Sequence, residues 1–236
     1  MRVYAGTSGF SYPAWRGSFY PPKLPAAAML AHYAQRLPAV EINHTFYRMP
    51  SAEQLEKWCA QVPAPFRFSL KASRRITHIK RLADCREETE YLFRAASALG
   101  DRLGSVLFQL PPSVRADRAR LAAFLEILPQ AVQVAVEFRH ASWFDQPILD
   151  LLSARGLALV VTDSDEVPVH SLTCTADWAY LRLRRSGYAA AALEDWAQRV
   201  KAAGLREVHV FFKHEDQGVG PRLAAQFLER VGGDSA

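Results

Sequence analysis

The sequence predicts an α/β fold, a TIM-type (β/α)8 barrel of parallel strands, from three observations. The chain has 236 residues, which is close to the length that a closed β/α barrel needs. Eight short runs rich in β-forming residues recur along it, and helix-like segments separate most of them. Because one core can accommodate this length, we expect a single TIM-type barrel domain over residues 1–236.

The predicted strands are short and regularly spaced. They span residues 3–8, 40–46, 66–71, 105–110, 134–139, 157–162, 178–184 and 208–213. Ser51 with Gln54 and Asp84 with Glu87 are typical of helix N-termini. Residues 163–177 have no helical period, so we expect the helix after the sixth strand to be short or missing. An open doubly wound sheet is the weaker alternative, because no glycine-rich nucleotide turn follows the first strand.

Composition restricts the function classes. Half of the residues are hydrophobic, which excludes a disordered chain, and the net charge of +5 indicates a mild preference for anionic partners. The three cysteines are widely spaced without a CxxC pair, so neither a disulfide framework nor a zinc knuckle is indicated. The sequence begins without a cationic segment leading to an apolar run, and no stretch reaches membrane-spanning length. We expect a cytoplasmic protein with no membrane partner.

Several predicted strands alternate polar and apolar residues instead of being apolar throughout. In the second, Val40 and Ile42 would face the surrounding helices, while the polar residues between and after them would point into the barrel. The side chains that this alternation directs inward are Glu41, Asn43, Thr45, Ser69, Lys71, Ala135, Glu137, Arg139, Tyr180, Arg182 and Arg184. Barrel interiors usually hold branched aliphatic residues, so this polar lumen is a departure.

The charged side chains of this lumen must be paired, solvated or bound to a ligand. An isolated polar group buried there would cost about 2 kcal/mol or more, and an isolated charge far more. One interpretation is an ion-pair network that merely fills the barrel. The other is a functional site, which we favour because hydrophobic side chains would fill the barrel at least as well. The charged residues also lie near the C-terminal strand ends, where barrel active sites are found.

Five motifs, in order along the chain, resemble one family. They read GTSGFSYPAWRGSFYP at 6–21, VEINHTFYRMPS at 40–51, FSLKASRRITHIKRL at 68–82, LFQLPPS at 107–113 and VEFRHASWF at 136–144. Over almost its whole length the chain resembles the domain-of-unknown-function family 72, the YecE-like proteins. The resemblance implies a TIM-type barrel but no established reaction. LRLRRSGY replaces an Arg-Leu-His-Gly run and FFKHED an Asn-Asn pair that such proteins tend to have, which leaves roles on that side of the mouth open.

Basic side chains are expected at the mouth from several strands, which favours a phosphate or carboxylate ligand. The leading hypothesis is an enzyme, a hydrolase or isomerase, that acts on a phosphate-bearing small molecule or nucleotide. The candidate acids and bases are Glu41, Glu137 and Asp163. The candidate ligand-binding residues are Tyr12, Trp15, Asn43, Lys71, Gln109, Arg139, His140, Trp143 and Arg182. Lys71, Arg139 and Arg182 would hold the anion, and Glu41 or Glu137 would move a proton.

No motif indicates a cofactor. The residues that could hold a divalent metal are Glu137, His140, Asp163, His170 and His214, although no HxH or HExxH spacing supports it. Glycoside hydrolysis is disfavoured, because the surrounding charge is too basic for a neutral sugar.

Two alternatives stay open. The residues of an aromatic first loop, which could form a stacking lid or a satellite core over the barrel end, are Phe10, Tyr12, Trp15, Phe19 and Tyr20. A stacking lid beside the basic loop of Arg74, Arg75 and Lys80 would make a nucleic-acid-binding module. The chain could also be a non-catalytic barrel scaffold that binds a partner.

Overall fold

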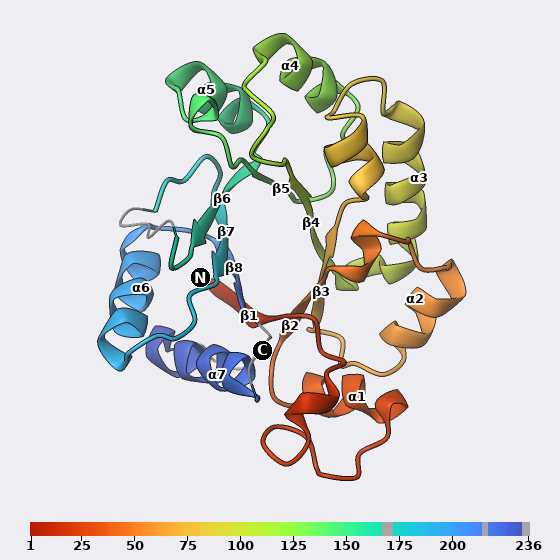
Figure 1. Ribbon diagram of the computed structural model, residues 1–236, viewed down its shortest axis with the longest axis vertical. Coiled ribbons are helices and arrows are strands. Elements are labelled where there is room, and N and C mark those ends of the chain that lie inside the picture. The colour runs from red at the N-terminus through yellow and green to blue at the C-terminus, as the bar shows by residue number, and fades with distance from the viewer. Residues whose placement is uncertain (167–171, 214–216, 233–236) are drawn as a thin grey trace.

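The computed structural model describes residues 1–166, 172–213 and 217–232. These residues form a closed barrel of eight parallel strands inside a ring of helices, which confirms the predicted TIM-type fold (Figure 1). The strands are β1 (Arg2–Ser8), β2 (Ala39–Ile42), β3 (Arg67–Lys71), β4 (Leu103–Gln109), β5 (Val134–Glu137), β6 (Ala158–Asp163), β7 (Trp178–Leu183) and β8 (Glu207–Phe212). The barrel closes because β1 pairs in parallel with both β2 and β8.

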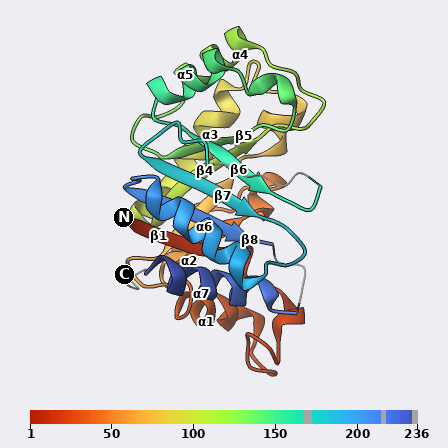
Figure 2. The same cartoon turned by 90° about the vertical axis from the view of Figure 1, so that its left-hand side faces the viewer.

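Helices cover the outside of the barrel. They are α1 (Met29–Ala34), α2 (Ala52–Cys59), α3 (Arg86–Ala96), α4 (Arg118–Glu126), α5 (Gln146–Ala154), α6 (Ala190–Ala202) and α7 (Val219–Val231). Figure 2 shows the strands crossing the molecule, with α4 and α5 at the top of the view, α1 and α7 at the bottom, and α6 in front of the strands. Within the described ranges, no helix combines the length and apolarity needed to cross a membrane.

The predicted helix starts are confirmed at one position and wrong at another. The Ser51 hydroxyl accepts a hydrogen bond from the Gln54 backbone N–H at 3.2 Å and caps α2. Asp84 does not cap α3, because Cys85 takes the N-cap position. Leu82 and Asp84 instead adopt left-handed backbone, with φ of 68° and 45°, in the turn that leads into the helix.

The connection between β6 and β7 differs from the other connections. Its described residues, 164–166 and 172–177, contain no helix, as predicted for this position, and residues 167–171 lie outside the described residues. In Figure 1 this connection lies between α5 and α6. The outer face of β6 is therefore less covered by these residues than a full β/α unit would cover it.

The second predicted strand is too long. β2 ends at Ile42, and residues His44–Phe46 form a short 3-10 helix. The Thr45 hydroxyl donates to the backbone carbonyls of Ile42 and Lys71 at 2.8 and 2.6 Å, so it does not point into the lumen as a strand residue would. Such local side-chain to backbone hydrogen bonds compete with strand pairing, which explains the early end.

The lumen has two layers. Its N-terminal half is filled mainly by apolar and aromatic side chains, which include Tyr4, Leu107, Tyr180 and Phe211. Its C-terminal half holds Glu41, Glu137 and Arg182, which the strand alternation predicted to point inward, whereas Ser69 bonds to Ser105 at 2.8 Å deeper in the barrel. The polar layer thus lies on the mouth side of the apolar layer.

Candidate functional site

A buried ion-pair network crosses the C-terminal half of the lumen. Arg182 of β7 donates from Nη2 to Glu41 Oε1 of β2 at 2.9 Å, and from Nη1 to Glu137 Oε2 of β5 at 2.7 Å. None of the three side chains is more than 3% exposed. One guanidinium thus joins carboxylates from two separate strands, and these three charges are paired with one another.

Glu41 is held as a carboxylate by several donors. Ser8 Oγ and Asn43 Nδ2 donate to its Oε1 at 2.7 and 2.9 Å, and the Tyr180 hydroxyl donates to its Oε2 at 2.7 Å. Burial alone would raise the pKa of Glu41. The Arg182 guanidinium and the hydroxyl donors outweigh burial and lower this pKa to about 2. Glu41 is therefore ionised at any pH near neutrality.

Glu137 is ionised for the same reason. Its Oε1 accepts from Arg139 Nε at 3.0 Å, and Arg182 holds the other oxygen. Burial would raise the pKa of Glu137, but the two guanidinium groups outweigh burial and lower it. A carboxylate with a depressed pKa is a weak base, so both predicted proton carriers are fixed anions near neutral pH.

Lys71, the last residue of β3, extends into the mouth beside this network. Its ammonium lies 4.3 Å from the centroid of the Phe46 ring and makes no hydrogen bond or ion pair with any described residue. Burial, followed by the positive charge of Arg182, lowers the pKa of Lys71 to about 8, although the two carboxylates oppose the shift. The lowered pKa brings the titration of Lys71 close to neutral pH.

Cations outnumber carboxylates in the cluster around Arg182. The charges of Lys71, Arg182 and Arg184 interact with Glu41 and Glu137, Arg139 binds Glu137, and burial and Arg182 lower the pKa of Arg184. Some buried polar atoms at these strand ends have no hydrogen-bond partner among the described residues, namely Gln109 Oε1, Thr162 Oγ1, Arg182 Nε and Arg184 Nη1. Buried polar groups normally have partners, so these atoms indicate room for water or for a ligand.

A cavity of about 720 Å³ opens next to this cluster. Its lining includes the cations Arg139, Arg184 and Lys213, the carboxylates Glu137, Asp165 and Glu166, and the rings of Phe138 and Phe144. Residues from both faces of β6 border it as well, where the described part of the β6–β7 connection adds no helix. Its volume is in the range of small-molecule sites.

The predicted aromatic loop packs as a satellite core. Trp15 is fully buried, and its ring contacts those of Tyr12, Phe19 and Tyr20 at centroid distances of 4.8, 5.8 and 5.9 Å. The Tyr12 hydroxyl donates to the Ser8 backbone carbonyl at 2.7 Å. The structure therefore leaves the Trp15 face unavailable for stacking on a ligand.

Two other predicted ligand-binding residues stabilise the loop after β5. Trp143 Nε1 donates to the Val114 carbonyl at 2.8 Å, and its ring stacks on Phe138 with centroids 4.3 Å apart. His140 Nδ1 accepts from the Ser142 backbone N–H at 3.1 Å. Both residues shape the rim of the mouth without projecting into the ion-pair network.

Asp163 does not join the other two carboxylates. It lies one residue past Thr162 on β6, and its side chain faces α6, where it accepts from Trp196 Nε1 at 3.1 Å. The Tyr188 hydroxyl and Arg185 Nε also donate to its carboxylate, at 3.0 and 2.9 Å. These contacts attach α6 and the loop after β7 to the barrel.

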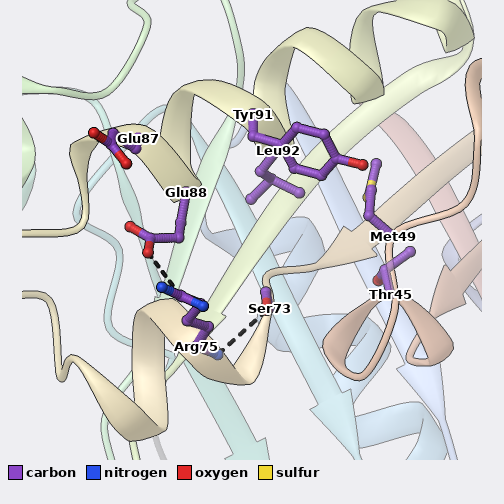
Figure 3. A pocket seen from close by; sticks show the side chains of 8 residues that line it. All are labelled: Thr45, Met49, Ser73, Arg75, Glu87, Glu88, Tyr91 and Leu92. Atoms are coloured by element: carbon purple, nitrogen blue, oxygen red, sulfur yellow. Dashed lines mark hydrogen bonds and ion pairs between the residues drawn. The ribbon is translucent and has the colours of Figure 1, made fainter.

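The basic loop after β3 is tied to α3. Arg75 Nε and Lys80 Nζ donate to the two oxygens of Glu88 at 2.7 and 2.9 Å. Figure 3 shows the Arg75–Glu88 pair at one side of a second cavity, of about 310 Å³, with Tyr91 extending toward Met49 at the other side. These contacts occupy two of the three cations that the nucleic-acid interpretation requires.

Sequence reasoning missed Phe46 and His78 as site residues. The His78 ring packs edge-on against Phe46, with centroids 4.8 Å apart, so Phe46 is contacted by both His78 and Lys71. Burial and the charge of Lys71 lower the pKa of His78. His78 lies in a π-helix, Arg75–Ile79, and such segments are frequent at functional sites but have no clear sequence signature.

The candidate metal ligands do not converge in the part of the chain that the structure describes. There, no group of three His, Cys, Asp or Glu side chains is placed to share a metal ion. Asp163 faces α6 and His140 caps the loop after β5, away from Glu137. His170 and His214 lie outside the described residues.

Curated relatives share the sequence over part of their length. The chain is 32% identical over 176 residues to the UPF0759 protein YecE of Escherichia coli (strain K12), and 29% identical over 177 residues to the UPF0759 protein YunF of Bacillus subtilis (strain 168). These matches cover 72% and 70% of this chain. They cover 61% and 62% of the relatives, so the match spans about three fifths of their length.

Solved structures share the fold over nearly the whole chain. A DUF72 family protein from Thermotoga maritima is 29% identical, with a TM-score of 0.85 over 98% of this chain and 100% of that one. A DUF72 family protein from Enterococcus faecalis is 20% identical, with a TM-score of 0.82 over 99% of this chain and 97% of that one. The family described as "Protein of unknown function DUF72" matches residues 4–236. The chain therefore belongs to the DUF72 family.

Proposed function

We propose that this protein is an enzyme that binds a small phosphate-bearing anion at the C-terminal mouth of the barrel. One observation carries the proposal: donors on Arg182 and Arg184 are buried without partners among the described residues, in a cluster where four basic side chains surround Glu41 and Glu137. An anion would supply the acceptor that these donors lack. The location supports catalysis, because the C-terminal face is where barrel enzymes place their active sites.

The site divides into a fixed part and a binding part. Arg182 is hydrogen-bonded to Glu41 and Glu137, so these three side chains fix the position of the site and contribute a constant electrostatic field to it. Lys71 and Arg184, with Arg139 at the rim, are the groups that would contact the anion. Guanidinium groups bind phosphate oxygens in pairs and the ammonium adds a compact charge.

The proposal favours a small ligand over a nucleic acid. Base stacking would need exposed aromatic rings in the first loop, and Trp15 is fully buried there. The backbone contacts would need the basic loop after β3, where Arg75 and Lys80 are already paired with Glu88. The free volume and the donors without partners lie instead at the mouth.

A binding titration tests the proposal. Inorganic phosphate, sugar phosphates and nucleotides are titrated by calorimetry and thermal shift, in the wild type and in Lys71→Met and Arg139→Ala. A ligand at 100 times its Kd raises stability by about 2.7 kcal/mol. Loss of one charged hydrogen bond should lower affinity roughly tenfold or more in Lys71→Met. Lys57→Met is the control, because Lys57 is exposed on α2 and paired with Glu53.

Two results would count against the proposal. One is the absence of binding by every phosphate compound in folded wild-type protein. The other is binding that Lys71→Met and Arg139→Ala leave unchanged. Oligonucleotide affinity that falls steeply with salt and depends on Arg74, Arg75 and Lys80 would instead support a nucleic-acid interface.

A further inference from the structure

Lys71 is placed differently from other lysines of the chain. Lys57 pairs with Glu53 at 2.6 Å and Lys80 pairs with Glu88 at 2.9 Å, as surface lysines commonly do. The Lys71 ammonium has two carboxylates in its surroundings, but Arg182 already binds both. Its three N–H donors therefore have no acceptor among the described residues, and its side chain is held against an aromatic ring at the open end of the barrel.

We infer that Lys71 is a nucleophile, whose amine forms an imine with an aldehyde or ketone group on the bound anion. The inference rests on the proposed anion site and names its substrate class: a small carbonyl compound that carries a phosphate or another anionic group. Arg139 and Arg184 would hold the anionic group, and the carbonyl carbon would face Lys71 Nζ. Lys71 is not among the residues that line the cavity of about 720 Å³, but its charge interacts with those of Arg182, Arg139, Glu41 and Glu137 in the adjoining cluster.

The surroundings of Lys71 favour the neutral amine that such an attack requires. Burial and the charges of Arg182 and Arg139 disfavour the ammonium, while Glu41 and Glu137 favour it, and the balance lowers the pKa to about 8. Roughly one Lys71 side chain in ten is then neutral at pH 7, against roughly one in three thousand for a lysine of ordinary pKa. Desolvation beside other cations is a known way to activate a lysine.

The reaction balances with the groups that are present. The Lys71 Nζ lone pair attacks the carbonyl carbon, a C–N bond forms, and the carbonyl oxygen takes up a proton while the nitrogen loses one. The resulting carbinolamine loses water, the C–O bond breaks and the C=N bond forms. Amine and carbonyl give imine and water, so no oxidant or reductant is needed. His78 contacts the same Phe46 ring as Lys71 and is neutral near pH 7, because burial and the charge of Lys71 lower its pKa, so its ring would relay the proton between nitrogen and oxygen.

The segment that carries His78 is held in costly backbone conformations. It contains the π-helix Arg75–Ile79, followed by three residues with positive φ, Arg81 at 52°, Leu82 at 68° and Asp84 at 45°. Such conformations are unfavourable for residues other than glycine, and strain of this kind clusters at functional sites. The strained segment places the His78 ring against Phe46, next to the lysine.

Reductive trapping tests the inference. Pyridoxal 5′-phosphate, an aldehyde that carries a phosphate, is mixed with the full chain and cyanoborohydride, and the modified peptides are identified by mass spectrometry. The chain has few lysines, so each site can be followed, at positions Lys23, Lys57, Lys71, Lys80, Lys201 and Lys213. We expect Lys71 to be modified at least tenfold faster than Lys57 and Lys201 at pH 7, with a rate that rises to a midpoint near pH 8.

Variants separate the roles of the residues. Lys71→Arg keeps the charge and should abolish the fast modification, whereas Lys57→Arg should leave it unchanged. His78→Gln should slow the modification of Lys71, and the pH at which the modification rate is half-maximal should not rise. Pyridoxal, which lacks the phosphate, should react at Lys71 at least tenfold more slowly than the phosphorylated aldehyde.

Inorganic phosphate binding, followed by thermal shift in wild type and Lys71→Arg, distinguishes this inference from the proposed function. If phosphate binds but Lys71 is modified no faster than exposed lysines, the imine inference is overturned and the anion site stands. If phosphate does not bind and Lys71 is not selected, both fail. Preferential modification of Lys213 would also overturn the assignment of the nucleophile.

Discussion

Replacement of Arg182 by Met should leave the carboxylates of Glu41 and Glu137 buried without the guanidinium group that binds them both. Arg182 donates to both Glu41 and Glu137, at 2.9 and 2.7 Å, and its side chain is only 3% exposed. Methionine has a similar length but offers no positive charge. The two carboxylates would keep their burial and lose the group that stabilises their ionised form.

The expected cost is large and its pH dependence is specific. Removing one partner of a buried ion pair typically destabilises a protein by about 3–5 kcal/mol. In the wild type the pKa of both carboxylates lies below the ordinary 4.5, so their stabilisation is present above that pH and is lost as the pH falls. In Arg182→Met the charge that most opposes burial is absent, so both pKa values should rise relative to the wild type and the cost of the substitution should grow as the pH rises.

Urea unfolding at pH 5 and pH 8, followed by circular dichroism, measures both effects. The difference in unfolding free energy between wild type and Arg182→Met should be larger at pH 8 than at pH 5. Arg139→Met is the matched control, because Arg139 binds the same Glu137 but its side chain is 43% exposed, so its loss should cost about 1 kcal/mol or less. The reasoning is refuted if Arg182→Met costs no more than Arg139→Met, or if the cost of Arg182→Met is no larger at pH 8 than at pH 5.

Three further predictions concern single side chains. Glu41→Gln should remove the part of acid unfolding that Glu41 causes, about 3 kcal/mol lost by the wild type between pH 4.5 and pH 2, and urea titrations across that range check it. Lys71→Met should stabilise the protein at pH 7 by about 1–3 kcal/mol, because a lysine with a lowered pKa opposes folding while it is charged; this gain should shrink between pH 8 and 10.5. Gly6→Ala should prevent recovery of folded protein, because its Cβ would lie 1.8 Å from the Ala39 carbonyl oxygen, whereas Gly187→Ala, with no atom within 4 Å, should fold normally, as thermal melts would show.

Strand alternation located the ion-pair network because parallel strands leave a polar side chain few alternatives. Val40 and Ile42 pack against helices, so Glu41 has only the lumen to occupy, and the same logic places Arg182 on the inner face of β7. The reasoning uses the fact that successive side chains of a strand point to opposite faces. Strand alternation therefore identified which side chains share the lumen. It could not give the distances that show whether each of these charges has a hydrogen-bond partner.

Predictions at strand ends and in loops were less successful, for a physical reason. Asp163 is the last residue of β6, and a single step along a strand changes the face on which a side chain lies, so the carboxylate packs against Trp196 instead of the mouth. Trp15 and Tyr20 could form either a stacking lid or a core. Composition does not distinguish these outcomes, because the same rings serve both.

The most informative residue of the mouth is the one that contributes least to the stability of the fold. An interior designed only for stability would pair every charge, as Arg182 does with its two carboxylates, or would omit the charge altogether. Lys71 does neither, since burial and neighbouring guanidinium groups penalise its ammonium and no described residue accepts from it. Proteins keep such costs where function requires them. A variant such as Lys71→Met that gains stability while losing phosphate affinity would therefore be stronger support for a functional mouth than either effect alone.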